Sequence, residues 1–434
     1  MEDVERSVIR KINRRIIPIL VIASFLAYLD RVNVSFAAIG MNKDLGFTPT
    51  VYGWGAGIFF IGYFFFEVPS NLALERFGSR FWIARIMLSW GLISTAMAFV
   101  WSKESFYVLR FLLGVAEAGF FPGLLLYMTY WVPARHRARV SSYFMVTIPL
   151  SGVLGAPLSG ALLSMDGWFG LRGWQLLYIL EGVPSSVLAF VIWRVLHDTP
   201  AKAPWLTDGE RRWLDATLAA EAAAGPAPAA RPSLVRMLAN PKLILFSLAF
   251  FGLVACNYGV AFWLPQIVKE LGFSNGMTGL LVAIPFAAGA VGMVLNARRS
   301  DLRQERRWHS ALPPLIAALG LIGSTLVAGP LPKMLLISIA SIGIYAVLAP
   351  FWSLVSLQFP GAVAAASIAF INSIGNLAGF AGPFALGYFK EATGGFAGGL
   401  VFVALLGLAA AAIILLVTHN RPAALARPPA RALN

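Results

Sequence analysis

The chain has 434 residues, of which 58% are hydrophobic and only 12% are charged. Soluble domains of this length do not have such a composition, and the apolar runs recur along the whole chain. Both features exclude a globular enzyme with one membrane anchor and predict an all-α polytopic membrane protein. Cys256 is the only cysteine, which excludes intramolecular disulfides and thiolate metal clusters.

The four histidines fall in predicted loops or tails, and no two of them have the spacing of metal ligands. We therefore expect neither a metal nor an organic cofactor. These histidines are His136, His197, His309 and His419.

The apolar runs, read against the polar residues between them, give twelve predicted transmembrane helices. The first 15 residues are charged and amphipathic, and no small-residue cleavage site follows the first apolar run, so we expect that run to be retained as a helix. An even number of spans puts both termini on the same side. The approximate limits of the spans are 16–40, 51–74, 82–101, 105–131, 140–164, 173–196, 242–268, 275–297, 309–329, 333–357, 361–389 and 395–418.

One long polar break, from His197 to Pro241, separates the first six spans from the last six. Its first part predicts a short helix, and its second part, which is rich in alanine and proline, predicts a linker. We therefore expect five segments. These are an N-terminal segment (1–15), an N-terminal six-helix bundle (16–196), the linker (197–241), a C-terminal six-helix bundle (242–418) and a tail (419–434).

The two halves look like copies of one six-helix unit. A shift of 226 residues superposes Arg80 on Arg306, and the same shift carries Pro157 onto Pro383, each in a glycine-rich span. Copies with the same orientation in the membrane are parallel repeats. In that layout a substrate site lies near the membrane midplane, between two halves that rock against each other.

The lysines and arginines are distributed unequally between the two sides of the membrane. About 26 of the 34 fall in the termini, the linker and the loops on the same side. The positive-inside rule places that side, with both termini, in the cytoplasm and predicts a multi-pass protein of the inner membrane. The rule also accounts for the net charge of +14 without a nucleic-acid partner.

Four charged residues within the predicted spans need an explanation. They are the adjacent Asp30 and Arg31, and Arg110 and Glu117 on a later span. A charge near the centre of a membrane helix costs about 2.5–3.5 kcal/mol on insertion scales. At 1.5 Å per residue, Asp30, Arg31 and Glu117 lie at similar depths, and Arg110 shares a helix face with Glu117. Two interpretations remain: a structural ion pair that locks helices together, or a site where an anionic solute and a proton meet.

The chemistry of these side chains suggests a role for each. An arginine stays charged and holds a carboxylate through two parallel hydrogen bonds, whereas a buried carboxylate gains or loses a proton as an anion arrives or leaves. We therefore assign Arg31 to binding a substrate carboxylate, and Asp30 and Glu117 to proton coupling. Arg110 is interpreted as the partner of Glu117, with a purely structural ion pair as the alternative. The two arginines and two carboxylates are expected to neutralise each other when the site is empty.

Several segments resemble the major facilitator superfamily, and more narrowly its anion:cation symporter family. NLALERFGSR resembles the loop signature after the second helix, although Asn71 and Glu75 stand where glycine and aspartate are more usual. The resemblance implies a twelve-helix fold of two parallel repeats that functions as a monomer, and permeases for acids such as tartrate, hexonates and phthalate. The other matching segments are SGVLGAPLSG, YLDRVNVSFA, VLRFLLGVAEAGFFPG, GWQLLYILEG, YGVAFWLPQI, APFWSLVSLQFPG and INSIGNLAGFAGP.

The C-terminal half carries no equivalent charges and is expected to contribute uncharged contacts. Asn372 and Asn376 lie four residues apart on one helix face, with Trp352 and Tyr258 as further candidates. The alternative is that the asparagines only join membrane helices, at about 0.6 kcal/mol per hydrogen bond. Tyr63 is a ligand candidate because of the resemblance.

Charged loop residues on the predicted cytoplasmic side are expected to form an inner gate, whose salt bridges close when the site faces outward. Exposed pairs are individually weak, which suits a network that breaks and re-forms. Glu67 and Glu181, within the spans, are expected to pair with backbone groups or arginines. The gate residues are Glu75, Arg76, Gly78, Arg80, Arg135, Asp301 and Arg306.

The sequence thus predicts a proton-coupled symporter of a small organic carboxylate such as tartrate, with the proton as coupling ion. An uncoupled uniporter or exchanger of aromatic or sugar acids is the alternative, although a passive pore needs no buried titratable acids. An intramembrane enzyme is disfavoured because the sequence offers no nucleophile–base pair.

Overall fold

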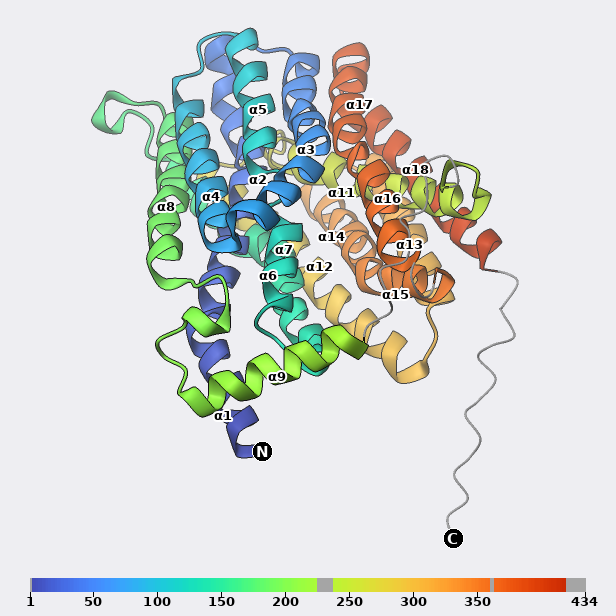
Figure 1. Ribbon diagram of the computed structural model, residues 1–434. Coiled ribbons are helices and arrows are strands. Elements are labelled where there is room, and N and C mark those ends of the chain that lie inside the picture. The colour runs from blue at the N-terminus through green and yellow to red at the C-terminus, as the bar shows by residue number, and fades with distance from the viewer. Residues whose placement is uncertain (1, 225–236, 360–362, 419–434) are drawn as a thin grey trace.

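The computed structural model describes residues 2–224, 237–359 and 363–418, and these residues form helices joined by short connections. Twelve helical stretches in these ranges are long and apolar enough to cross a membrane, which confirms the expected fold class. Figure 1 shows two bundles side by side, the N-terminal half in blue to green and the C-terminal half in yellow to red. The predicted tail, residues 419–434, lies outside the described residues.

The N-terminal half is preceded by α1 (Glu2–Arg15) and followed by α9 (Asp208–Ala224), which pack against each other. We call the side on which they lie the terminal face and the opposite side the distal face. The helices of this half are α2 (Ile17–Leu45), α3 (Pro49–Phe77), α4 (Ser79–Ala96), α5 (Lys103–Glu117), α6 (Phe120–Thr129), α7 (Ala134–Leu163) and α8 (Gly173–Val195), with short 3₁₀ turns at Met97–Phe99, Trp168–Gly170 and Pro200–Lys202.

The C-terminal half repeats this arrangement of long and interrupted helices. Its last span passes from the distal to the terminal face, so the described chain begins and ends on the terminal side. The helices are α11 (Pro241–Lys269), α12 (Asn275–Arg303), α13 (Arg307–Leu326), α14 (Pro330–Ala346), α15 (Leu348–Gln358), α16 (Ala364–Asn376), α17 (Ala378–Thr393) and α18 (Ala397–Val417).

The ends of the helices follow local sequence signals more closely than they follow the limits of the apolar runs. The first span was predicted to end at residue 40, but α2 continues to Leu45 and stops where Gly46 adopts the left-handed conformation, with φ of 67°. The next helix starts after Thr48, whose hydroxyl accepts a hydrogen bond from the Val51 amide, with Pro49 in the first turn. Two histidines also differ from the prediction: His136 and His309 lie in the first turns of α7 and α13, not in loops.

The two halves approach each other most closely along two seams of small residues. In the seam between α3 and α17, a Cβ added to Gly53 would lie 2.7 Å from the Pro383 carbonyl oxygen. In the seam between α7 and α12, a Cβ added to Gly160 would lie 2.8 Å from the Asn275 carbonyl oxygen. Larger side chains at these glycines would push the helices apart, as expected for small-residue contacts between membrane helices.

Hydrogen bonds between the halves lie on the distal side or at the level of Arg31. Within the described ranges there are four: Arg31 to Tyr258, the Thr50 amide to Glu391 at 2.9 Å, Tyr52 to the Phe262 carbonyl at 2.7 Å, and Asn275 to the Leu163 carbonyl at 3.3 Å. In the same ranges no hydrogen bond or ion pair joins the terminal ends of the two halves. The two halves are therefore joined on the distal side, and among the described residues they are not joined by hydrogen bonds or ion pairs on the terminal side.

On the terminal face, α9 is held against α1 by a buried carboxylate. Lys11 donates to Glu210 at 2.6 Å and Ser7 donates to it at 2.7 Å. Although desolvation opposes ionisation, the hydrogen bonds from Lys11, the Thr207 amide and Ser7 lower the pKa of Glu210 to about 2. Glu210 therefore remains ionised throughout the physiological pH range, and its contact with α1 is maintained.

Candidate functional site

The helix that carries Glu117 is interrupted directly after this residue, although the sequence predicted one continuous span from 105 to 131. Helix α5 ends at Glu117, Ala118 leaves the helical conformation, and Gly119 has a φ of 81° before α6 begins. A Cβ on Gly119 would lie 2.5 Å from the Ser70 hydroxyl oxygen, so both the backbone angle and the packing favour glycine. The break fixes the position of the Glu117 carboxylate at the end of α5.

Arg31 on α2 forms an ion pair with Glu117 through Nη2, and both side chains are largely buried. Its other terminal nitrogen, Nη1, donates to the Tyr258 hydroxyl at 2.9 Å, and Tyr258 belongs to α11 of the other half. The guanidinium thus joins α2 and α5 to the C-terminal half. Arg31 and Glu117 come together at one level of the bundle, as their predicted depths indicated.

Three aromatic rings surround the Arg31 guanidinium. The ring centroids of Tyr28, Phe59 and Tyr63 each lie 5.3 Å from its central carbon, within the range of a cation–π contact. Sequence reasoning named Tyr63 and missed Tyr28 and Phe59. Tyr28 precedes Arg31 by three residues and Phe59 precedes Tyr63 by four, so helical spacing gave a usable signal.

Arg110 does not bond to Glu117, which differs from the expected pairing. It is fully buried, and it donates from Nε to the Gly55 carbonyl at 3.2 Å and from Nη2 to the Ala56 carbonyl at 3.0 Å. Its Nη1 has no hydrogen-bond partner among the described residues. Helices α3 and α5 pack so closely that a Cβ on Gly114 would lie only 2.0 Å from the Phe59 carbonyl oxygen. This close packing brings the Gly55 and Ala56 carbonyls within reach of Arg110.

Asp30 points away from Arg31, into the interior of the N-terminal half. Its carboxylate accepts hydrogen bonds from Trp90 at 3.0 Å, Ser94 at 2.9 Å, Ser185 at 2.7 Å and Asn33 at 3.3 Å. All four donors are uncharged, and no ion pair involving Asp30 is present in the described ranges. The expectation that two arginines and two carboxylates neutralise each other is therefore confirmed only for Arg31 and Glu117. Asp30 takes no part, because successive residues of a helix project in different directions.

The candidates in the C-terminal half take different positions. Tyr258 contacts Arg31 directly, whereas the Trp352 ring packs against Phe250 with centroids 4.7 Å apart. Asn372 and Asn376 lie partly buried on α16, and the described residues provide no hydrogen-bond partner for either side chain. The structure therefore brings one of these four residues to the guanidinium.

Glu67 and Glu181 were expected to pair with backbone groups or arginines, and neither kind of partner is present for these carboxyls among the described residues. Glu181, on α8, accepts a hydrogen bond from Ser159 at 2.7 Å, and its Oε2 atom is buried without a partner in the described ranges. Glu67 is buried on α3, and no ion pair of the described chain includes it. Neither carboxyl therefore contacts a cationic side chain among the described residues.

The predicted gate residues make their contacts within each half. Arg80 donates through Nε to the Trp193 carbonyl at 2.5 Å, and Arg306 pairs with Asp301 at 2.6 Å. Arg135 pairs with Glu5 of α1. Gly78 has a φ of 89°, whereas Glu75 and Arg76 lie exposed at the end of α3. In this conformation, none of these residues forms a bridge across the terminal face to another described residue.

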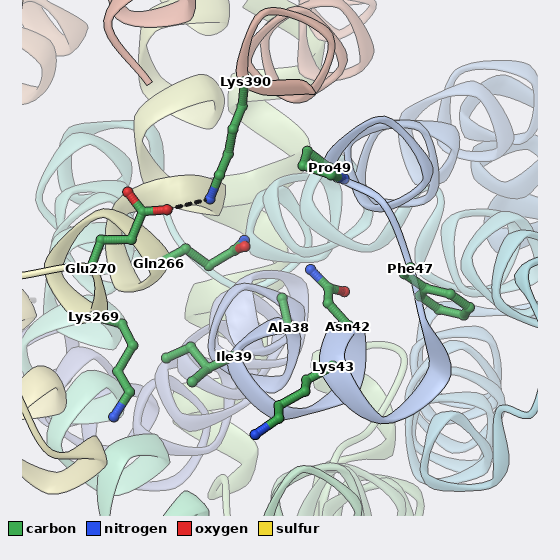
Figure 2. A pocket seen from close by; sticks show the side chains of 10 residues that line it. All are labelled: Ala38, Ile39, Asn42, Lys43, Phe47, Pro49, Gln266, Lys269, Glu270 and Lys390. Atoms are coloured by element: carbon green, nitrogen blue, oxygen red, sulfur yellow. Dashed lines mark hydrogen bonds and ion pairs between the residues drawn. The ribbon is translucent and has the colours of Figure 1, made fainter. Parts of the chain in front are cut away.

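On the distal face, a pocket of about 270 Å³ lies between the two halves (Figure 2). Lys390 forms an ion pair of 2.6 Å with Glu270, and Lys269 donates to the Phe273 carbonyl at 2.8 Å. Lys43 makes no ion pair with the described residues, so the pocket carries an excess of positive charge. Its lining residues are Ala38, Ile39, Asn42, Lys43, Phe47, Pro49, Gln266, Lys269, Glu270 and Lys390.

Comparisons with known proteins agree with this architecture. The chain is 49% identical to an Agrobacterium vitis protein that has the provisional name "tartrate transporter", over 97% of this chain and 96% of that one. It is 40% identical to the "Quinolone resistance transporter" of Acinetobacter baumannii, over 94% of each chain. The fold matches a bacterial homolog of the human lysosomal transporter Spinster in an inward-facing, unoccupied conformation, with a TM-score of 0.78, 17% identity and coverage of 93% of this chain and 96% of that one. Because the family model of the Major Facilitator Superfamily also matches residues 20–383, the chain belongs to this superfamily of membrane transporters.

Proposed function

We propose that the protein is a proton-coupled symporter that takes up a small organic carboxylate, such as tartrate, across the inner membrane by alternating access. The observation that carries this proposal is the buried ion pair between Arg31 and Glu117, which also contacts Tyr258 of the opposite half. A guanidinium between the two halves suits recognition of a carboxylate, and a titratable partner links that recognition to a proton.

The ion pair gives the proposed coupling a simple mechanism. A substrate carboxylate that binds Arg31 competes with Glu117 for the same donors, so Glu117 loses its cation when substrate binds. An ionised carboxylate left buried without a cation is costly, and taking up a proton removes that cost. Substrate and proton are then carried together, and departure of the substrate allows Arg31 and Glu117 to pair again. Asp30 is the second acid of the proposed coupling.

Charge on the two faces supports the proposed orientation. Lysines and arginines are concentrated in the termini and loops of the terminal face, which the positive-inside rule assigns to the cytoplasm. An anion arriving from outside would meet the distal pocket with Lys43, Lys269 and Lys390 before it reaches Arg31. The conformation described here is then open toward the cytoplasm.

The substrate class is tested by competition in proteoliposomes. We expect uptake of radiolabelled tartrate to be competed by other small hydroxy acids and much more weakly by the corresponding amides or methyl esters. A neutral group opposite Arg31 loses charge-assisted hydrogen bonds worth about 1.5–3 kcal/mol each. Equal competition by the neutral amide would contradict the proposal.

The direction and energy source need a separate experiment, because the Acinetobacter baumannii relative is named for quinolone resistance. We expect accumulation of tartrate inside vesicles with an imposed proton gradient, acid outside, and its loss when an uncoupler is added. Facilitated entry that is unaffected by the uncoupler would favour the uncoupled uniporter or exchanger.

A further inference from the structure

Glu181 is an acidic residue of the membrane interior to which the proposed mechanism gives no role. It lies on α8 with 1% of its surface exposed, and the Ser159 hydroxyl donates to its Oε1 at 2.7 Å. Its Oε2 atom is buried without a hydrogen-bond partner, and no lysine, arginine or histidine of the described chain forms an ion pair with it. An ionised carboxylate whose second oxygen has no donor is poorly compensated in this position.

Asn33, on α2, is a neighbour of both acids. Its Nδ2 donates to Asp30 at 3.3 Å, and its side chain also faces the Glu181 carboxyl. The Asn33 Oδ1 atom is buried and has no donor among the described residues. Two acceptors without donors, Glu181 Oε2 and Asn33 Oδ1, therefore belong to neighbouring side chains.

A proton on Glu181 would remove the uncompensated charge. A protonated carboxyl has an O–H group, which can donate to the Asn33 carbonyl oxygen and leaves Glu181 uncharged. Asp30 differs because four uncharged donors, from Trp90, Ser94, Ser185 and Asn33, stabilise its ionised form. Two neighbouring carboxylates with no cation beside them cannot both remain charged at low cost, and the hydrogen bonds assign the charge to Asp30.

We propose that Glu181 is a proton-binding site of the N-terminal half and that it holds its proton in the conformation open to the terminal face. The functional consequence rests on the proposed transport of organic carboxylates. When alkaline pH removes the proton, Glu181 and Asp30 repel each other and this conformation is destabilised. The groups that face Glu181 are Asp30 from α2, Ser159 from α7 and Tyr178 from α8, and the described part of α4 presents no charged side chain to it.

Infrared spectroscopy of the purified protein tests protonation independently of transport. We expect a carboxylic-acid C=O band at neutral pH that shifts in heavy water and has a component that is lost in Glu181→Gln. The matched control Glu104→Gln, on the exposed start of α5, should keep the band. A band that is lost in Asp30→Asn but retained in Glu181→Gln would place the proton on Asp30 and overturn the proposal.

Substrate exchange at equal pH on both sides of the vesicle tests the consequence, because it requires no net proton movement. We expect wild-type exchange to fall about tenfold or more at alkaline pH, and the decline to begin at a higher pH in Glu181→Gln, because glutamine is permanently neutral and only the protonation of Glu117 then limits exchange. Glu104→Gln should follow the wild-type profile. An alkaline decline that is identical in Glu181→Gln, or a folded Glu181→Gln protein without exchange at any pH, would contradict the proposal. Absence of carboxylate exchange in the wild type would instead refute the proposed function, while the infrared result would still decide the state of Glu181.

Discussion

At the scale of single residues, the site depends on the shape of Arg31 as well as on its charge. One terminal nitrogen pairs with Glu117, the other donates to Tyr258, and three aromatic rings lie around the guanidinium plane. A lysine ammonium has the same charge but lacks the planar pair of donors.

We therefore expect Arg31→Lys to reduce tartrate uptake about 100-fold or more while leaving insertion into the membrane normal. Loss of two charge-assisted hydrogen bonds at about 1.5–3 kcal/mol each is sufficient for this effect. Uptake in vesicles, normalised to the amount of folded protein, measures it. Wild-type uptake in the variant would remove Arg31 from the site.

Glu117→Gln separates binding from coupling. Glutamine imitates the protonated acid, so we expect the variant to bind and exchange tartrate but to lose accumulation against a gradient. The two measurements are counterflow and proton-driven uptake on the same vesicles. Full proton-driven accumulation would show that Glu117 is not the coupling acid.

The prediction that Arg31 and Glu117 lie at the same depth was confirmed. The common depth of Arg31 and Glu117 follows from the helical rise, and the structure brings the two side chains together. The partner of Arg110 was not predictable in this way, because its carbonyl partners come within reach only through close packing of α3 and α5 at glycine positions. Three of the four donors to Asp30, Trp90, Ser94 and Ser185, come from α4 and α8, which are distant from Asp30 in the sequence.

At the scale of helices, the position of the site depends on interruptions that hydrophobicity does not show. The break after Glu117 is fixed by the left-handed Gly119, and the continuous apolar pattern of residues 105–131 concealed it. The number of spans and the parallel repeat could be predicted from the sequence, because they depend on the length of the apolar runs and on the repeat along the chain. Contacts such as that of α9 with α1 depend on tertiary packing.

The contact between α1 and α9 serves as a control for pH effects. The lowered pKa of Glu210 means that its stabilising contribution is fully present above the ordinary glutamate pKa and is lost only as pH falls toward about 2. We therefore expect Glu210→Gln to loosen α9, seen as faster hydrogen exchange of the α9 amides, without altering the pH profile of transport between about pH 5 and 8. A changed profile in this variant would mean that the terminal helices contribute to the pH dependence.

At the scale of the whole molecule, the two halves are joined on the distal side and carry no mutual hydrogen bonds on the terminal side in the described ranges. Alternating access requires the opposite arrangement to form as well. The seams of small residues determine how stable the distal closure is.

Enlarging a seam residue should shift the balance between the two arrangements. A side chain on Gly53 meets the Pro383 carbonyl oxygen, so we expect Gly53→Leu to weaken distal closure and to bring the terminal ends of the halves closer together. Spin labels at residues 76 and 301, measured by electron–electron double resonance, report that distance. Gly395→Leu is the control variant, because a Cβ added to Gly395 meets no atom within 4 Å. An unchanged distance distribution would contradict the role of this seam.

The most direct test of the proposed coupling is proton movement driven by substrate alone. In vesicles without an imposed pH gradient, a tartrate gradient across the wild-type protein should carry protons in the same direction, recorded by an external pH electrode. Glu117→Gln should exchange tartrate without this proton movement. Tartrate flux through the wild type with no accompanying protons would contradict the account in which substrate and Glu117 compete for Arg31.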